Sequence, residues 1–216
     1  TCRSRDIYSQ FAADLREETG IDIELETSGT LYLAFSEHDV HELEHRYVWQ
    51  TEAGLPVQML TRDEAQTLEP GISEAAQLAL KFPLDIQVEN RRLLTALATS
   101  SQQLGVHLVT GTTVQSLNLR RGRIFGIETS RGDVATENVV IAGGAWTSML
   151  NVPDKALPDI GIEPVRGQML CFEANPQIAR HVIYSPRGYI VPRQDGRLLA
   201  GSTSENAGFA KCVTAG

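Results

Sequence analysis

Apolar residues follow two different spacings along this 216-residue chain, and the change between them is the feature that most constrains its fold. Residues 4–19, 36–54 and 90–104 repeat apolar side chains every three or four positions, which predicts amphipathic helices. The stretches between and after them alternate apolar and polar residues or form short apolar runs, which predicts strands. Short strands mixed with helices favour an α/β (α+β) fold that contains antiparallel sheet.

Capping residues and prolines locate the ends of these helices more precisely. Ser36 with Asp39, and Thr61 with Glu64, have the spacing of capping boxes, and the second predicts a short helix that ends before Pro70. The predicted inward faces are Ile7, Tyr8, Phe11 and Leu15 in the first helix, Val40, Leu43 and Tyr47 in the second, and Leu93, Leu94, Leu97 and Leu104 in the last. The predicted strands are 21–26, 31–35, 77–82, 106–109, 113–119, 124–129, 134–136, 139–142, 168–173, 189–192 and 198–201.

Charge and cysteine content disfavour several classes of protein. The chain has 27 acidic and 19 basic residues, a net charge of −8, whereas proteins that bind nucleic acid through its phosphates carry basic surfaces. No apolar run approaches the roughly 20 residues needed to cross a bilayer. Cys2, Cys171 and Cys212 are odd in number and far apart, which predicts free thiols in a reducing compartment. We therefore expect a cytoplasmic protein with no nucleic-acid partner and no membrane span.

Three histidines in the second predicted helix have a spacing that could serve a metal ion. His38, His41 and His45 stand at positions i, i+3 and i+7, so their imidazoles could approach one ion. They fall, however, on the side of the helix opposite Val40 and Leu43, among glutamates. A solvated polar face explains this pattern better, and we predict no metal site.

The segment 139–146 combines an apolar run with small residues. Val139, Val140, Ile141 and Ala142 predict a fully buried strand, and Gly143, Gly144 and Ala145 follow before Trp146. Small residues at the carboxyl end of a strand allow a backbone or a cofactor to approach closely. A tight turn from a strand into a helix would need the same residues, so the pattern alone leaves both interpretations open.

A third candidate site lies in the segment 184–204. Tyr184 and Arg187 precede a predicted strand in which Tyr189 and Val191 share one face. Two tyrosines and an arginine beside a cleft could orient a small carboxylate, because the guanidinium geometry suits a carboxylate. Amphipathic tyrosines at the rim of a sheet would give the same pattern without a ligand.

Several familiar motifs have no counterpart in the chain. It contains no Gly-x-Gly-x-x-Gly, no Gly-x-x-x-x-Gly-Lys phosphate loop and no Gly-x-Ser-x-Gly nucleophile elbow. No residues of these 216 are therefore expected to cradle a pyrophosphate.

Taken together, seven short motifs in the family's order make the chain resemble the D-amino-acid oxidase family of flavoproteins, nearest to its glycine-oxidase branch of thiamine biosynthesis. Thr136 contributes to this likeness, because it precedes the apolar run as in two-dinucleotide-binding flavoproteins. The motifs are residues 18–22, 29–34, 68–71, 139–146, 164–168, 189–193 and 201–203. The resemblance extends over essentially the whole chain.

The resemblance implies a fold, a cofactor and a reaction. It implies an FAD domain interrupted by a substrate domain built on antiparallel sheet, with residues 1–20 and 86–159 in the first and residues 21–85 and 160–216 in the second. It further implies FAD-dependent oxidation of a small amine or amino acid, such as glycine, sarcosine or a D-amino acid, by hydride transfer to the flavin. The resulting imine hydrolyses, and the oxidases of the family return the electrons to O₂ as H₂O₂.

The resemblance also implies site residues. Those expected at FAD are Val114, Ala142, Gly143, Gly144, Ala145 and Trp146, and those expected around the substrate are Tyr184, Arg187, Tyr189 and Ser204. Arg187 stands where some relatives have a histidine, which leaves the substrate open. No catalytic residue is expected within the chain.

Two parts of the family pattern are missing from the sequence: the glycine-rich pyrophosphate loop and the Gly-Leu-Arg-Pro-like stretch that binds the substrate carboxylate. We therefore expect an internal portion of a longer protein that by itself neither binds FAD tightly nor turns over. The alternatives are a D-amino-acid dehydrogenase or a sarcosine-oxidase-like relative, or a non-catalytic module that binds a ligand without flavin. A homo-oligomer is possible in each case.

Overall fold

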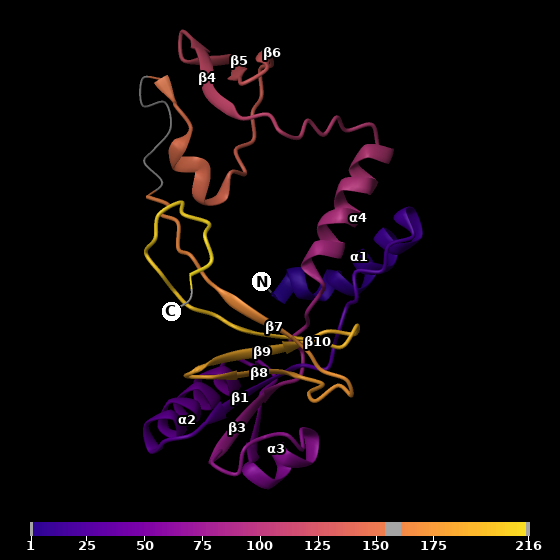
Figure 1. The fold of residues 1–216 in the computed structure, drawn as a ribbon, viewed down its shortest axis with the longest axis vertical. Coiled ribbons are helices and arrows are strands. Elements are labelled where there is room, and N and C mark those ends of the chain that lie inside the picture. The colour runs from indigo at the N-terminus through magenta and orange to yellow at the C-terminus, as the bar shows by residue number, and fades with distance from the viewer. Residues whose placement is uncertain (1, 154–160, 215–216) are drawn as a thin grey trace. The chain divides into compact units, whose positions relative to one another are not determined.

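The computed structural model describes residues 2–153 and 161–214, which form two compact units (Figure 1). The first unit comprises Thr1–Val106 and Gln168–Ser202, and the second comprises His107–Gly167 and Thr203–Gly216. The mixed α/β fold predicted from the sequence is confirmed. No helix among the described residues is long and apolar enough to cross a membrane.

A seven-stranded sheet organises the first unit. Its order is β2-β3-β1-β8-β9-β10-β7, and every neighbouring pair is antiparallel except β1 with β8. The strands are β1 (Thr30–Ala34), β2 (Gln58–Thr61), β3 (Leu78–Phe82), β7 (Met169–Glu173), β8 (Val182–Ser185), β9 (Gly188–Pro192) and β10 (Arg197–Gly201). Its helices are α1 (Cys2–Thr19), α2 (Glu37–Glu52), α3 (Arg62–Leu68) and α4 (Asn90–Gln103).

Alternation along β1 places helices on opposite faces of the sheet. Leu31 and Leu33 pack with Ala65 of α3, whereas Ala34 packs with Leu43 of α2 and with Leu80. Both helices begin at the capping boxes that the sequence predicts, with Ser36 and Thr61 as the N-cap residues.

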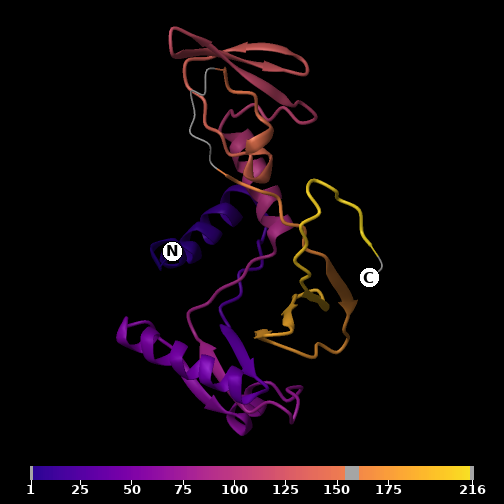
Figure 2. The ribbon, with the colours of Figure 1, turned by 90° about the vertical axis from the view of Figure 1, so that its left-hand side faces the viewer.

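Helices α1 and α4 pack against each other around a smaller core (Figure 2). Leu15, Ile23 and Ala96 are buried there, and Tyr8 and Phe11 pack against them. The predicted inward faces are only partly correct. Ile7 of α1 is exposed. Leu94, Leu97 and Leu104 are exposed as well, because Ala96 and Ser100 instead form the buried side of α4.

Strand predictions fail where no neighbouring strand is available. Residues 21–26 form only an isolated bridge between Glu26 and Gln87, because Glu24 adopts a positive φ of 53° and interrupts the extended chain. Residues 106–109 form no strand, and Val106, Leu108 and Val109 are exposed. Two strands were not predicted: β2, at the exposed edge of the sheet, and β8, between β1 and β9.

The second unit contains a three-stranded antiparallel sheet, β4-β5-β6, and the short 3₁₀ helix η1 (Gly144–Met149). Its strands are β4 (Val114–Arg120), β5 (Arg123–Thr129) and β6 (Gly132–Ala135), close to the predicted ranges. The prediction for 139–142 is wrong for the described residues: no strand forms, and Val140 is 92% exposed. An apolar run becomes a buried strand only where other strands flank it, and none does so here.

The assignment of these segments to an FAD domain and a substrate domain stays a prediction. The predicted boundary at residues 159 and 160 lies outside the described residues.

Candidate functional site

Three tyrosines from neighbouring strands form one row across the sheet of the first unit. Tyr32 of β1 is opposite Tyr184 of β8, and Tyr184 is opposite Tyr189 of β9. Directly opposed residues project from the same face of a sheet, so the three rings lie side by side. The Tyr32 and Tyr184 rings are stacked with centroids 6.2 Å apart, and the Tyr184 and Tyr189 centroids are 4.9 Å apart. These residues are called the tyrosine row below.

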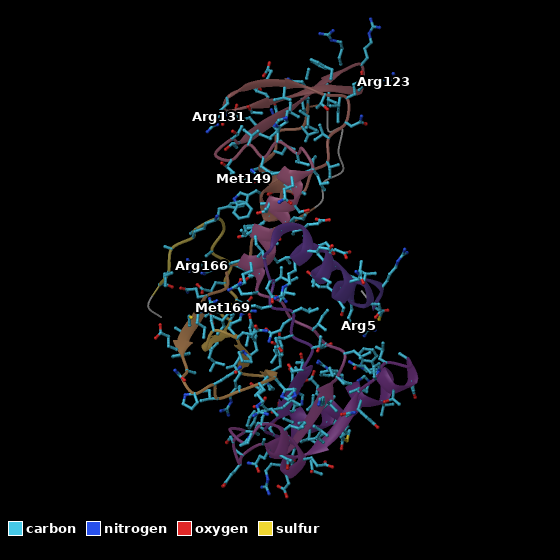
Figure 3. The ribbon with its side chains drawn as sticks, turned by 90° about the vertical axis from the view of Figure 1, so that its right-hand side faces the viewer. Arg5, Arg123, Arg131, Met149, Arg166 and Met169 are labelled. Atoms are coloured by element: carbon cyan, nitrogen blue, oxygen red, sulfur yellow. The ribbon has the colours of Figure 1, made fainter. Side chains whose placement is uncertain are left out.

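A glycine and a methionine continue this row toward the sheet edge. Gly201 of β10 is opposite both Tyr189 and Met169 of β7. A Cβ atom at Gly201 would lie 2.8 Å from Cγ of Met169, so only glycine leaves room for this methionine (Figure 3 labels it). The Tyr189 hydroxyl donates to the Met169 sulfur at 3.9 Å. The row therefore ends in a flexible apolar side chain beside Tyr189.

A cleft of about 820 Å³ lies at the other end of the row. The sheet contributes Tyr32, Tyr184 and Val191, and α2 contributes Arg46 and Gln50. The remaining lining residues are Cys2, Arg5, Thr30, Leu55, Pro56, Phe82, Leu84, Asp85, Ile86, Gln87, Val88, Val182 and Arg193. These residues are called the sheet cleft below. The size suits a small-molecule ligand.

The phenol of Tyr184 is held in its neutral form. Burial raises the pKa of Tyr184 above its ordinary value, and the neighbouring Tyr189 and Asp85 raise the pKa further. Tyr184 therefore presents a protonated hydroxyl at neutral pH, which is able to donate a hydrogen bond to a carboxylate.

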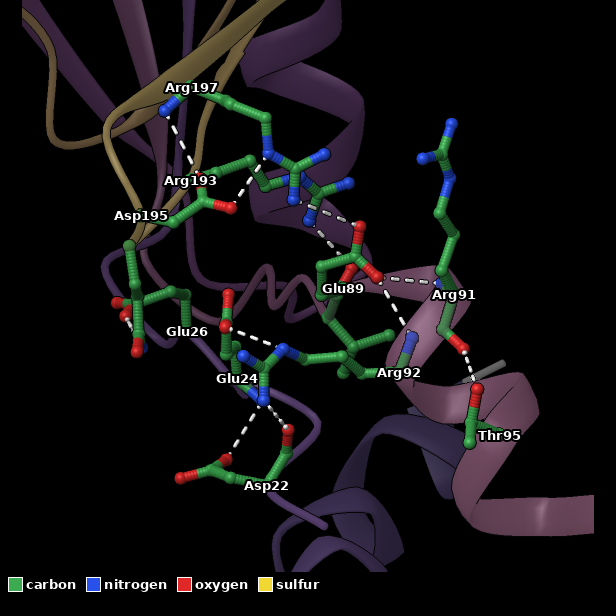
Figure 4. Close-up of polar contacts among 12 residues, drawn as sticks. Asp22, Glu24, Glu26, Glu89, Arg91, Arg92, Thr95, Arg193, Asp195 and Arg197 are labelled. Carbon is green, nitrogen blue, oxygen red and sulfur yellow. Dashed lines mark hydrogen bonds and ion pairs between the residues drawn. The ribbon is translucent and has the colours of Figure 1, made fainter.

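A buried carboxylate anchors the wall of the sheet cleft near Arg193 (Figure 4). Glu89 is only 3% exposed, and its carboxylate caps α4 by accepting from the backbone N–H groups of Arg91 (2.7 Å) and Arg92 (2.9 Å). It also pairs with Arg197 at 3.5 Å. Burial opposes ionisation most strongly, but the Arg92 and Arg91 N–H groups and the charges of Arg193 and Arg197 together lower the pKa of Glu89.

The predicted substrate residues are only partly brought together. Tyr184 and Tyr189 lie in one row, and their contact with a substrate stays a prediction. Arg187 lies in the exposed turn between β8 and β9, where its backbone N–H donates to Ser185 at 3.2 Å. Ser204 is exposed and belongs to the second unit. Sequence reasoning missed Tyr32 and Arg46. Only the pairing of β1 with β8 brings Tyr32 beside Tyr184, and only the packing of α2 places Arg46 over the Tyr32 ring.

The predicted cofactor residues all lie in the second unit. Val114 begins β4 opposite Thr129 and is 41% exposed. Ala142, Gly143 and Gly144 are exposed, and a Cβ atom at Gly144 would meet no atom within 4 Å. Asn151, which follows η1, hydrogen-bonds with its backbone to Gln115 and Leu117 and so ties the end of this segment to β4.

Trp146 has two aromatic-face contacts in the same unit. Phe209 lies 6.1 Å from it between ring centroids, and the Lys211 ammonium lies 4.6 Å from its ring centroid. Small exposed residues at 142–144 leave room for a flat ring system, which fits part of FAD. The sequence contains no loop for its pyrophosphate.

His38, His41 and His45 are exposed on α2, as expected of a solvated face. His41 pairs with Glu44 at 3.8 Å. Within 2–153 and 161–214, no group of three metal-binding side chains comes together.

Comparison with known proteins identifies the family. Residues 3–215 match the family described as DAO: FAD dependent oxidoreductase. Glycine oxidase from Geobacillus kaustophilus (strain HTA426) is 35% identical over 217 residues, covering 99% of this chain and 56% of the relative. The bifunctional protein ThiO/ThiG from Nostoc sp. (strain PCC 7120) is 31% identical, covering 96% of this chain and 31% of the relative.

A solved structure supports the same relationship. The crystal structure of glycine oxidase from Bacillus cereus ATCC 14579 superposes with a TM-score of 0.89 at 32% identity, covering 98% of this chain and 58% of that one. The chain thus spans about half the length of the glycine oxidases that it matches. Because the family match includes nearly every residue, the chain belongs to the DAO family of FAD dependent oxidoreductases.

Proposed function

We propose that the protein is an FAD-dependent oxidoreductase that oxidises a small amine or amino acid, as glycine oxidase does by its name. Family membership and the tyrosine row support this proposal, and the tyrosine row is the observation that carries it. The row gives an aromatic surface that carries hydroxyl groups, beside a cleft of ligand size. When bound, FAD would supply the acceptor for the hydride of the substrate, with O₂ as the final acceptor and H₂O₂ as product.

The residues of the row would bind and orient the substrate. The Tyr184 hydroxyl, kept neutral by burial, would donate a hydrogen bond to the substrate carboxylate. Tyr189 and Met169 would form an apolar wall that excludes water from the reacting carbon. Arg187 and Ser204 remain candidates for the same site on the basis of the family resemblance.

The cofactor would be held by the second unit. Val114, Ala142, Gly143, Gly144, Ala145 and Trp146 are the proposed residues, since they combine an exposed strand end with small residues that allow close approach. A small-molecule amine or amino acid is the proposed partner, with a homo-oligomer as a further prediction.

The test uses the product of the complete reading frame, purified and supplied with FAD. Glycine, sarcosine, D-alanine and both enantiomers of glutamate are mixed with it anaerobically, and bleaching of the visible flavin absorbance is recorded. We expect at least one of them to bleach the flavin, and O₂ to restore the colour with stoichiometric H₂O₂. A panel that leaves the flavin oxidised would contradict the proposal.

A dehydrogenase is the alternative within the family, and the same experiment distinguishes it. A dehydrogenase would bleach equally well but would pass its electrons to a dye or quinone, with slow recovery in O₂ and little peroxide. A non-catalytic module would show no flavin spectrum at all.

A further inference from the structure

The sheet cleft is cationic although the chain as a whole carries a net charge of −8. Arg5, Arg46 and Arg193 line it, whereas Asp85 is the single acidic side chain among its lining residues in the described chain. Local charge of one sign in a concave site raises the concentration of ligands of the opposite sign. The composition of the lining therefore favours an anionic ligand.

Two of these arginines already have partners. Arg5 (labelled in Figure 3) pairs with Asp6 at 2.8 Å, and the charge of Asp85 also acts on it. Arg193 donates to the backbone carbonyl of Val88 at 2.8 Å and faces the charge of Glu89. Neither guanidinium is free to bind a ligand carboxylate without giving up a contact.

Arg46 differs from both. It projects from α2 and its guanidinium carbon lies 4.9 Å from the ring centroid of Tyr32. Within 2–153 and 161–214, no carboxylate lies within ion-pair distance of it. A guanidinium that lies over an aromatic ring, with no carboxylate paired to it, has N–H groups available for the two parallel hydrogen bonds that a carboxylate accepts.

The position of Arg46 fits the far end of an elongated ligand. Tyr32 lies one strand away from Tyr184, about 5 Å at the usual strand spacing, and both residues line the sheet cleft. A glycine-sized molecule whose carboxylate meets Tyr184 would leave the space over Tyr32 empty. A side chain ending in a carboxylate would cross that space and reach Arg46.

We propose that the sheet cleft binds an amino acid with an anionic side chain and that Arg46 binds the distal carboxylate of that ligand. This inference rests on the proposed function, whose substrate class it narrows. Arg46 is a specificity-determining residue in this scheme and takes no part in the oxidation itself.

The test measures binding rather than turnover, so it needs no flavin. Glutamate and glutamine, each as the D- and L-enantiomer, are titrated into the purified protein by calorimetry. The two ligands have the same shape and differ by one charge. For the enantiomer that binds more tightly, we expect the dissociation constant of glutamate to be at least about ten-fold lower than that of glutamine. A charge-assisted hydrogen bond contributes a difference of this size.

Three variants assign the preference to Arg46. R46Q is expected to bind glutamate and glutamine equally. R46K is expected to keep part of the preference for glutamate, because lysine retains the positive charge but lacks the planar guanidinium that makes two parallel hydrogen bonds. R120Q is the matched control, since Arg120 also lies 4.9 Å over an aromatic ring, that of Phe125, but in the second unit. It should leave the preference unchanged. If R46Q fails to fold, the test uses R46K instead: its preference for glutamate over glutamine should be partial and should decline with added salt.

The outcomes separate this inference from the proposed function. Equal binding of glutamate and glutamine by the unaltered protein, or a preference that survives in R46Q, would overturn the role of Arg46 even if glycine reduces the flavin. Glutamate binding that depends on Arg46 would uphold it even if no amine reduces the flavin of the complete protein, which would overturn the proposed function alone.

Discussion

At the scale of single residues, the polar groups that matter most are buried carboxylates with several partners. Glu69 is 2% exposed and lies directly after α3. One of its oxygens accepts from the backbone N–H groups of Arg180 (2.8 Å) and His181 (2.6 Å) and contacts Nδ1 of His181 at 2.6 Å. This carboxylate joins residues more than a hundred positions apart, at the entry to β8.

Replacing Glu69 by alanine is expected to lower the free energy of unfolding by about 3 kcal/mol, because the buried N–H of His181, the part-buried N–H of Arg180 and the imidazole lose their acceptor. E69Q keeps a carbonyl oxygen and should cost less. Urea unfolding measures both. Glu74 is exposed, and E74A is the control, expected within about 0.5 kcal/mol of the unaltered protein. Equal stability of E69A and E74A would contradict the role given to Glu69.

The tyrosine row makes a kinetic prediction at the same scale. Under the proposed function, Y184F should lower kcat/KM of the complete protein by about ten- to hundred-fold, since a hydrogen bond to the charged carboxylate of the substrate is worth about 1.5–3 kcal/mol. Y8F is the control, because Tyr8 packs against the small core of Leu15, Ile23 and Ala96. Steady-state rates with the best substrate of the panel provide the measurement, and an unchanged Y184F would remove this hydroxyl from the site.

At the scale of elements, local side chains decide where helices begin. Ser36 accepts from the N–H of Asp39 at 3.2 Å, and the Asp39 carboxylate accepts from the N–H of Ser36 at 3.0 Å. The backbone N–H of Phe35 is the main cause that lowers the pKa of Asp39. The reciprocal bonds fix the start of α2, and through it the position of Arg46 beside the sheet.

S36A is expected to lower the free energy of unfolding by about 1 kcal/mol, because the N–H of Asp39 loses its acceptor. The control is S9A on the exposed side of α1, where alanine favours the helix and stability should be kept or slightly raised. Chemical denaturation compares the two. An S36A protein as stable as S9A would show that the capping box contributes little.

Glu89 links the start of α4 to the β9–β10 hairpin, and its lowered pKa gives a pH dependence. A carboxylate with a folded pKa below its unfolded value of about 4.3 stabilises the fold fully above that value. The contribution is lost as the pH falls through the folded pKa. E89Q should therefore be less stable by about 2 kcal/mol at pH 7, with the difference shrinking below about pH 4.

Denaturant unfolding at pH 7, 5, 4 and 3 measures this difference. E17Q, which changes an exposed carboxylate of α1, is the control and should follow the unaltered protein at every pH. A difference between E89Q and the unaltered protein that is independent of pH would mean that the charge of Glu89 does not stabilise the fold.

At the scale of the whole molecule, each compact unit combines segments that are distant in the sequence. The tyrosine row and the sheet cleft lie in the first unit, and the proposed cofactor residues lie in the second. The chain spans about half of its glycine-oxidase relatives, and no part of it has the glycine pattern that cradles a pyrophosphate.

We expect the 216-residue chain to bind FAD at least about a hundred-fold more weakly than the product of the complete reading frame, because charge-assisted bonds to the phosphates are worth about 1.5–3 kcal/mol each. Visible absorbance after dialysis against FAD measures the bound flavin. If the proposed cofactor residues hold FAD, W146A should weaken FAD binding by the complete protein relative to the unaltered complete protein. Stoichiometric flavin on the 216-residue chain would refute this prediction.

The sequence by itself determined the helices, their capping boxes, most strands and the family. These features depend on residues that are neighbours in the chain, and hydrophobic spacing and capping reflect that local chemistry. The same evidence pointed to Tyr184 and Tyr189, which stand five residues apart on the two strands of one hairpin.

Only the tertiary structure decided which residues meet across the sheet. Tyr32 and Arg46 join Tyr184 through a parallel pairing of strands about 150 residues apart, and no local signal encodes that partner. The apolar run at 139–142 gives the opposite case. Its composition predicts a buried strand, yet it forms no strand and leaves Val140 and Ala142 exposed. Strand formation and burial depend on neighbours supplied by the fold, and a spacing pattern contains no information about them.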